Sequence, residues 1–378
     1  MSAVNAKTPH SYSNTSGSSG AVDDWQCVSS SDDSDFNEVL KMSVDAIQAG
    51  VYPQLIADGS SGSYFVRDKG GEIIAVFKPR DEEPFAELNP KWPKFFQRIL
   101  CFCCFGRACL IPNSGFLSET AASFIDARLE LFIVPKTRIV KLCSPTFYYG
   151  RCCGRRIEPK PKQGSFQLYV NGYRPAMEVM AEWNDLGVNN VLSKIEIDEF
   201  TILFQKLCIL DYVIRNTDRH LDNWLIRHVP KKELKIAAID NGLAFPVKHP
   251  EKASRFRHFP FEWSTLTWAT KQWDSKLRDH LLKLITPLFL DTLCRELMML
   301  FRMDKTHSRL LHHAQIRVLR GQVWNLCQSL SARESPCELV KRPRVIMSRR
   351  YRGPPPSNDW ERCFKIRHDD SLSERTCC

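Results

Sequence analysis

The sequence predicts an α+β fold of two lobes, in which a small β-rich lobe precedes a larger, mostly helical lobe. Two observations support this prediction. Most of the short strand-like runs lie before about residue 171, and amphipathic helical patterns dominate from there to about residue 331. A chain of 378 residues also has room for one domain of roughly 300 residues, predicted over residues 36–345, between two tails.

The first lobe is predicted over residues 36–171. Its expected elements are a helix over Phe36–Ile47, strands over Tyr64–Val66 and Ile73–Phe77 that form a hairpin, a helix over Leu117–Leu131, and a strand over Ser165–Val170. Ser118 is the candidate N-cap of the second helix, because a serine hydroxyl accepts a bond from the first turn. Residues 1–35 are rich in Ser, Asn and Gly, which predicts disorder.

The second lobe is predicted over residues 172–345. Its expected elements are a long helix over Ile195–Ile214, strands over Asn223–Ile226 and Leu234–Ile239, and several amphipathic helices up to about residue 331. Residues 346–378 are rich in Pro and Arg, and we expect them to form a flexible basic tail.

The composition is 43% hydrophobic and 25% charged, which is typical of soluble globular proteins. The first twenty residues are polar, and no stretch reaches the roughly 18 apolar residues of a spanning helix, so we expect the domain to face the cytosol. The net charge of +10 suits nucleic acid or an anionic membrane surface. The chain contains no zinc finger, basic leucine zipper or aromatic ribonucleoprotein motif, so we expect no nucleic-acid partner.

The most informative pattern lies in the segment Arg215–Trp224 and shortly after it. Asp218 and Asn223 stand five apart, and Asp240 precedes Asn and Gly after a short apolar run. The catalytic loop of protein kinases places its base Asp and its metal-binding Asn at this spacing, and a second metal-binding Asp before a Gly follows. The pattern therefore predicts a kinase-like centre with Asp218 as the catalytic carboxylate and with Asn223 and Asp240 as metal ligands.

Three other residues of this loop have open roles. We expect Arg219 and His220 to shape the loop or to contact phosphate. Asp222 is either a solvated acid or an additional metal contact.

A Gly- and Ser-rich segment, Gly59–Phe65, lies ahead of the first-lobe hairpin, and Lys78 ends the second strand of that hairpin. Taken alone, the segment is more simply a surface turn and the lysine an ordinary strand end. With the Asp–Asn pair downstream, we interpret them as a phosphate-binding loop and an ATP-binding lysine. An acidic partner for Lys78 is expected on the first-lobe helix, where Glu119 and Asp126 are alternatives.

Longer motifs occur in a fixed order along the chain. They are Gly59–Val66, Ala75–Pro79, Glu82–Pro84, Leu88–Trp92, Cys103–Arg107, Gly164–Leu168, Asp211–Arg219, Asp222–Ile226 and Ala237–Pro246. With these motifs, the chain from about Phe36 to Val345 resembles the type II phosphatidylinositol 4-kinases. The resemblance implies a two-lobed protein-kinase-like fold and transfer of the γ-phosphoryl group of ATP to the 4-hydroxyl of phosphatidylinositol. It implies ATP and Mg²⁺, or Mn²⁺, as cofactors.

The resemblance also implies site residues. Lys78, Asp218, Asn223 and Asp240 are the expected catalytic residues, and the expected ATP-binding residues are Ser61, Gly62, Ser63, Lys78, Gln167, Leu168, Tyr169, Val170 and Leu243. Ser61 and Ser63 would line the phosphates. Backbone groups of Val170 would meet adenine, and Leu243 would line the adenine pocket.

Two features imply membrane association. Family members carry a Cys-Cys-Pro-Cys-Cys palmitoylation motif, and this chain keeps three of its thiols, those of Cys101, Cys103 and Cys104. We expect them to be acylated; the alternative is a cluster of small buried hydrophobic residues. Aromatic residues after the predicted metal-binding Asp, namely Phe256, Phe259 and Trp263, are expected to contact the membrane interface; the alternative is a solvated loop.

The expected partners are phosphatidylinositol in membranes, an anionic membrane surface, and trafficking adaptors bound through the N-terminal region. The expected location is the cytosolic face of the Golgi, trans-Golgi network and endosomes, or of the plasma membrane. Two other functions stay open: a lipid-binding scaffold without catalysis, and a kinase for a non-lipid acceptor.

Overall fold

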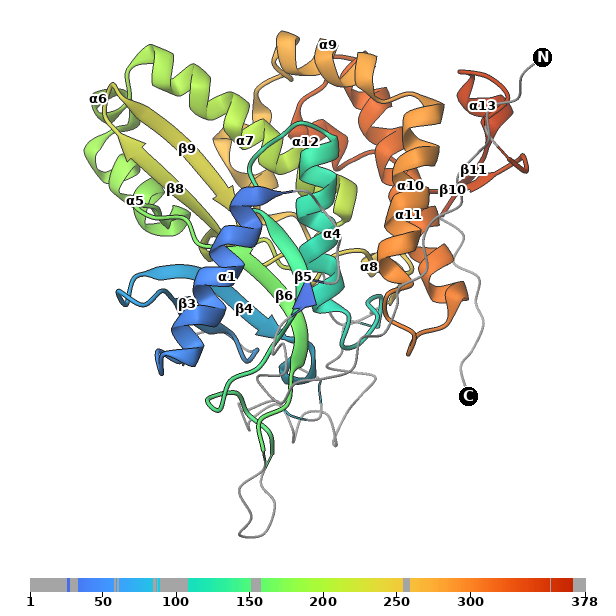
Figure 1. The fold of residues 1–378 in the computed structure, drawn as a ribbon. Coiled ribbons are helices and arrows are strands. Elements are labelled where there is room, and N and C mark those ends of the chain that lie inside the picture. Colours follow the sequence, from blue (N-terminus) through green and yellow to red (C-terminus); the bar gives the residue numbers. More distant parts are fainter. Residues whose placement is uncertain are drawn as a thin grey trace, which may run out of the picture.

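The structure is a computed structural model. It describes residues 26–27, 33–57, 59, 61–83, 86, 88, 108–150, 158–253, 259–353 and 355–369. Figure 1 shows helix α4 (Gly115–Arg128) between the sheet of the first lobe and the helices α10 (Pro287–Phe301) and α11 (Arg309–Ser331). The predicted α+β architecture is confirmed. Within the described residues, no helix has the length and apolar character needed to cross a membrane.

The first lobe contains a six-stranded antiparallel sheet with the order β1-β5-β6-β4-β3-β2. The strands are β1 (Gln26–Cys27), β2 (Gln54–Leu55), β3 (Tyr64–Arg67), β4 (Ile73–Pro79), β5 (Thr137–Leu142) and β6 (Lys162–Leu168). A short 3₁₀ helix, η1 (Arg80–Glu82), follows β4. The sequence predicts β3, β4 and β6, whereas β5 is not among the strands that it predicts.

Helix α1 (Ser34–Gln48) covers this sheet and confirms the helix predicted over Phe36–Ile47. Its buried residues include Phe36 and Leu40, which recur at helical spacing and face β3, β4 and β6. The ring of Phe36 meets that of Phe166 edge to face, with 5.7 Å between centroids. This packing holds the strand that carries Lys78 in a rigid sheet.

Helix α4 begins after Ser114, so the prediction that Ser118 is its N-cap is wrong. Ser118 lies inside the helix and its hydroxyl bonds to the carbonyl oxygens of Ser114 and Ala244, both at 3.3 Å. The first N–H groups of the helix donate instead to the carboxylate of Glu83, from Gly115 at 2.9 Å and from the next residue at 2.8 Å. A distant carboxylate thus takes over the role of the N-cap side chain.

The second lobe continues the chain from β7 to α12. Its elements are β7 (Arg174–Pro175), α5 (Ala176–Leu186), α6 (Val188–Val191), α7 (Lys194–Ile214), η2 (Leu221–Asn223), β8 (Trp224–Val229), β9 (Glu233–Ala238), α8 (Pro250–Ala253), η3 (Glu262–Thr265), η4 (Thr267–Thr270), α9 (Ser275–Leu284), α10, α11 and α12 (Pro336–Leu339). Strands β7, β8 and β9 form a small antiparallel sheet. The predicted helix over Ile195–Ile214 and the two strands after it are therefore present.

Helix α7 leads directly into the catalytic loop. It starts with a capping box between Ser193 and Glu196, and every residue from Leu207 to Ile214 is buried. The helix ends at Arg215, whose φ of +47° lies in the left-handed region. A buried helix thus fixes where the loop begins.

The predicted flexible tail is folded where the structure describes it. Strands β10 (Val345–Arg349) and β11 (Phe364–His368) form an antiparallel hairpin, with α13 (Trp360–Cys363) between them. The expectation of flexibility over these residues is wrong because apolar side chains of the hairpin, including Met347 and Phe364, are fully buried in the core of the second lobe.

Candidate active site

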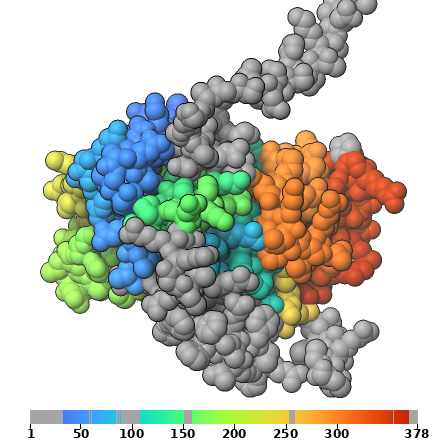
Figure 2. Space-filling view, turned by 60° about the horizontal axis from the view of Figure 1, so that its bottom comes forward, coloured from blue at the N-terminus to red at the C-terminus, as the bar shows by residue number. Residues whose placement is uncertain are grey.

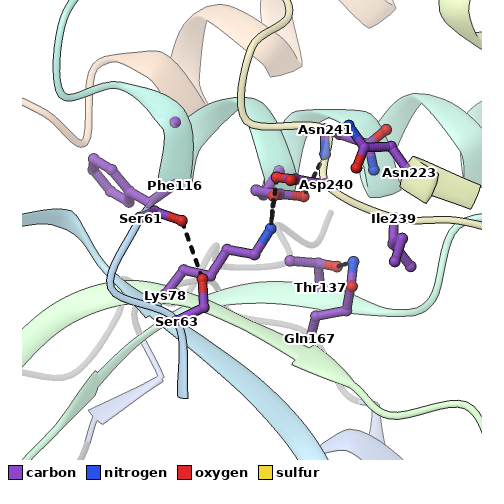
Figure 3. A network of polar contacts seen from close by, with 12 residues as sticks. Ser61, Ser63, Lys78, Phe116, Thr137, Gln167, Asn223, Ile239, Asp240 and Asn241 are labelled. Atoms are coloured by element: carbon purple, nitrogen blue, oxygen red, sulfur yellow. Dashed lines mark hydrogen bonds and ion pairs between the residues drawn. The ribbon is translucent and has the colours of Figure 1, made fainter. Parts of the chain in front are cut away.

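Lys78 lies between two carboxylates that come from different elements. Its Nζ atom lies 3.0 Å from Oδ1 of Asp240, after β9, and forms an ion pair with Glu119 on α4 (Figure 3). Glu119 is therefore the acidic partner of Lys78. The alternative, Asp126, lies two turns further along α4 and accepts a bond from the backbone N–H of Ile133 at 3.0 Å.

The charge on Lys78 is stabilised by these partners. Burial alone would lower the pKa of the ammonium group, but the nearby carboxylates of Asp240 and Glu119 outweigh burial and raise that pKa above its ordinary value. The side chain therefore stays charged at neutral pH, which suits it to bind phosphate oxygens.

Glu119 also holds the segment that carries Asp240. Its Oε2 atom accepts the backbone N–H of Asn241 at 3.0 Å, so one carboxylate fixes both the lysine and the residue after Asp240. The backbone of Asp240 has a φ of +52°, in the left-handed region, and its side chain is 52% exposed. The carboxylate thus lies at the surface of the site, where a cation could reach it.

The segment Ser61–Ser63, part of the predicted phosphate-binding loop, folds back onto η1. The hydroxyls of Ser61 and Ser63 lie 3.1 Å apart, and the N–H of Gly62 donates to the carbonyl oxygen of Glu82 at 2.9 Å. A Cβ atom on Gly62 would lie 2.5 Å from Oε2 and 2.7 Å from Cβ of Glu82, so a side chain at this position requires Glu82 to move. Figure 3 shows both serines beside Lys78, which is where the sequence predicts the phosphate loop.

The predicted adenine-binding residues are at the end of β6. The side chain of Gln167 lies on the same face of the sheet as Lys78 and donates to Oγ1 of Thr137 at 2.9 Å (Figure 3). The backbone N–H groups of Leu168 and Tyr169 donate within the lobe, to carbonyl oxygens 2.9 and 3.0 Å away. These groups support the sheet. Val170 follows them and is half-buried.

Leu243 is half-buried on the segment after Asp240, where its carbonyl oxygen accepts from the N–H of Thr217 at 3.0 Å and from the hydroxyl of the same residue at 2.7 Å. This contact ties the segment to the catalytic loop.

The catalytic loop is held by its own amides. The N–H of Asp218 donates to Oδ1 of Asn216 at 2.8 Å, and Nδ2 of Asn223 donates to the carbonyl oxygen of Asp218 at 2.6 Å. An amide that donates through Nδ2 presents Oδ1 as its acceptor, and Mg²⁺ takes oxygen ligands. The side-chain oxygens of Asn223 and Asp240 are thus donors of the type that a magnesium ion takes.

Arg219 shapes the loop; it is 4% exposed, which argues against a phosphate contact. Its Nε lies 3.0 Å from each carboxylate oxygen of Asp211 on α7. The rest of the guanidinium donates to the carbonyl oxygens of Asn223 and Ile239 and to Oδ1 of Asn241. One buried side chain thereby joins the segments of Asn223 and Asp240 to the core. The sequence leaves this role open because the partners are far apart in the chain.

His220 contacts the carboxylate of Asp218, the predicted catalytic residue. Its Nε2 lies 3.0 Å from Oδ1 of Asp218, and its Nδ1 lies 2.6 Å from Oε1 of Glu262 on η3. Sequence analysis missed Glu262, which lies between two aromatic residues and belongs to no motif. Asp222 is exposed.

The membrane-contact expectation is wrong for two of its three residues. Phe259 and Trp263 are only 6% and 1% exposed, and the ring of Trp263 stacks on that of Phe261 with 4.9 Å between centroids. Both side chains are therefore part of the protein interior, where aromatic burial is favourable. Phe256 lies outside the described residues, as do Cys101, Cys103 and Cys104.

Comparisons with known proteins show the family to which the chain belongs. Residues 59–307 match the family model "Phosphatidylinositol 3- and 4-kinase". The chain is 42% identical over 360 residues to phosphatidylinositol 4-kinase type 2-beta of Danio rerio, covering 85% of this chain and 70% of that protein. It is 42% identical over 352 residues to the type 2-alpha enzyme of Xenopus laevis, covering 84% and 74%. The chain therefore belongs to the type 2 phosphatidylinositol 4-kinase family, within the phosphatidylinositol 3- and 4-kinases.

Proposed function

We propose that this protein transfers the γ-phosphoryl group of ATP to the 4-hydroxyl of phosphatidylinositol. The observation that carries the proposal is the joined network of Lys78, Glu119 and Asp240 next to a catalytic loop that holds Asp218 and Asn223. Lysine, carboxylate and amide are the parts that phosphoryl transfer requires. Family membership supports the lipid acceptor and the 4-position.

The residues divide the reaction between them. Lys78 binds phosphate oxygens, and the hydroxyls of Ser61 and Ser63 can donate to others. Asp218 orients the acceptor hydroxyl and accepts its proton as the new oxygen–phosphorus bond forms and the bond to the ADP oxygen breaks. Because the transition state is loose, this positioning contributes more than the basicity of the carboxylate.

Asn223 and Asp240 would hold the divalent cation, Mg²⁺ or Mn²⁺. When bound, the cation supplies positive charge to the phosphate oxygens and the leaving group. Arg219 keeps the two ligand segments in place through the carbonyl oxygens of Asn223 and Ile239.

We extend the proposal to membranes. Acylation at Cys101, Cys103 and Cys104 would anchor the enzyme beside its lipid substrate, because two or more chains bind membranes stably. The proposed location is the cytosolic face of the Golgi, trans-Golgi network and endosomes, or of the plasma membrane, on an anionic surface that the net charge of +10 favours. Adaptor binding through the N-terminal region is part of the same proposal.

Replacing Cys101, Cys103 and Cys104 by Ser should release the protein from membranes. Unchanged pelleting of the protein with membranes contradicts the proposed acylation.

The test of the activity is transfer from labelled ATP to phosphatidylinositol in detergent micelles, with Asp240→Ala beside the wild type. Phosphatidylinositol 4-phosphate from the wild type alone, identified by chromatography, supports substrate, position and metal ligand together. A folded, ATP-binding wild type that makes no lipid product overturns the proposal and favours a scaffold. Transfer to peptide but not to lipid favours a kinase for a non-lipid acceptor.

A further inference from the structure

A chain of three side chains runs from the catalytic carboxylate to η3. Oδ1 of Asp218 meets Nε2 of His220 at 3.0 Å, and Nδ1 of the same ring meets Oε1 of Glu262 at 2.6 Å. His220 thus faces a carboxylate oxygen through each of its ring nitrogens. We propose that Glu262 is a positioning residue for phosphoryl transfer, which acts by fixing the imidazole ring of His220 against Asp218. The proposal deepens the proposed function and rests on it.

Glu262 is suited to this role because its backbone is firmly held. It lies between Phe261 and Trp263, which are 7% and 1% exposed and stack on each other. The guanidinium of Arg215 lies 4.3 Å from the ring centroid of Phe261, and the hydroxyl of Thr265 donates to the carbonyl oxygen of Glu262 at 2.8 Å. A half-exposed carboxylate is therefore carried on a rigid base in the core.

His220 bonds to the part of Asp218 that does the chemistry. The amide side chains of Asn216 and Asn223 bond to the main chain of Asp218, whereas His220 meets its carboxylate. An imidazole can turn about its Cβ–Cγ bond, and a second acceptor at Nδ1 fixes that rotation. Without Glu262, the orientation of the imidazole ring is less well defined. The carboxylate of Asp218, which must align the acceptor hydroxyl, is then less well oriented too.

The first test separates kcat from KM. Glu262→Ala should lower kcat by about 10-fold and leave the KM values for ATP and phosphatidylinositol unchanged, because misalignment reduces the stabilisation of the transition state and not the binding of the substrates. Glu262→Gln keeps an oxygen opposite Nδ1 and should recover most of the lost kcat. A fall in kcat that Gln does not recover, or a raised KM for the lipid at unchanged kcat, overturns the proposal.

A double-mutant cycle tests whether Glu262 acts through His220. His220→Ala should lower kcat at least as much as Glu262→Ala, and the double variant should be no slower than His220→Ala. Additive losses contradict the proposal. The matched control is Glu130→Ala, because Glu130 and His280 form an ion pair of 3.0 Å whose partners are exposed to a similar degree. This control should keep the wild-type kcat.

A measurement without turnover makes the outcome independent of the proposed activity. Nitrogen-15 NMR of the histidine rings, assigned with His220→Gln, should show the His220 signals moving in Glu262→Ala and staying in place in Glu130→Ala. Unmoved His220 signals overturn the inference. If the wild type has no lipid kinase activity but the His220 signals shift as expected, the proposed function and the positioning role of Glu262 are both overturned. The contact between Glu262 and His220 is then still supported.

Discussion

Lys78 and Arg219 show how single cations organise the site in different ways. Lys78 is partly exposed and bridges two carboxylates, so it can exchange one of them for a phosphate. Arg219 is buried and uses its planar guanidinium to reach Asp211 and the backbone of two segments at once. Lys78 is the cation that we propose for phosphate binding, whereas Arg219 fixes the relative positions of the segments that it contacts.

Replacing Lys78 by Met should weaken both ATP binding and turnover, with kcat/KM lower by about 100-fold or more, because a donor to phosphate is lost. Calorimetric titration with ATP and a turnover assay measure the two effects. Lys136→Met is the control, since Lys136 is about half exposed and forms its 3.0 Å ion pair with Asp33, ahead of α1. Wild-type ATP affinity in Lys78→Met would contradict the assigned role.

Replacing Arg219 by Lys should be costly although the charge is kept. A lysine cannot form the planar fork that meets Asp211, Ile239 and Asn241 together. We expect the free energy of unfolding to fall by about 3 kcal/mol, as for a broken buried ion pair, and kcat to fall with it. Urea unfolding and turnover assays test this. Arg227→Lys, at a partly exposed pair with Glu233, should change little; equal effects of the two changes would refute the prediction.

At the scale of elements, α4 connects the lysine to the metal-binding segment. It carries Glu119, it packs against β5, β6, α7 and α10, and its first N–H groups donate to Glu83. The carboxylate of Glu83 is buried, and burial raises its pKa to about 7 although the two N–H groups of α4 oppose this shift. The start of α4 therefore depends on a carboxylate that is costly to ionise.

The raised pKa of Glu83 makes the free energy of unfolding depend on pH, and the direction of the shift sets the sign of that dependence. The folded protein holds this proton more tightly than the unfolded chain, so the stability that the protonated Glu83 contributes is present below about pH 4.5 and is lost as the pH rises to about 7. In Glu83→Gln this loss, on the order of 3 kcal/mol, should be absent. Urea unfolding between pH 4.5 and 7.5 measures it. Glu38→Gln on the exposed face of α1 is the control, and parallel profiles of Glu83→Gln and wild type would disprove the prediction.

At the scale of the whole molecule, the C-terminal hairpin completes the second lobe, and Figure 2 shows it packed beside the α10 and α11 region at one end of the molecule. Strand β10 passes so close to α11 that a Cβ atom on Gly321 would lie 1.9 Å from the carbonyl oxygen of Val345. The obstacle is backbone, which cannot turn aside as a side chain can. The hairpin and α11 therefore fit together because one residue of the helix lacks a side chain.

Replacing Gly321 by Ala should destabilise the protein, although Ala favours a helix by about 1 kcal/mol over Gly. The clash with β10 should outweigh this preference and lower the free energy of unfolding by roughly 2 kcal/mol. Thermal and urea unfolding test the change. The control Arg309→Ala lies in the exposed first turn of α11 and should be close to neutral. A more stable Gly321→Ala would show that the hairpin does not pack against α11 in solution.

The sequence alone determined the two-lobed α+β class and the long helix that ends before Arg215, and it predicts the site residues Lys78, Asp218, Asn223 and Asp240. These depend on local spacing: a strand that ends in Lys, an Asp and an Asn five apart, and an Asp–Asn–Gly after an apolar run. The spacing of residues within a segment is a property of the sequence, so such a pattern can be recognised without coordinates.

The tertiary structure decided what depends on the relative placement of elements. Glu119 and Asp126 are seven residues apart, so they share a face of α4 about 10 Å apart along its axis, and only the position of α4 against β4 selects Glu119. The burial of Trp263, the folding of the tail against α11, and the contact of Glu262 with His220 likewise join segments distant in sequence. Periodicity shows which face of an element is apolar; packing alone shows what that face meets.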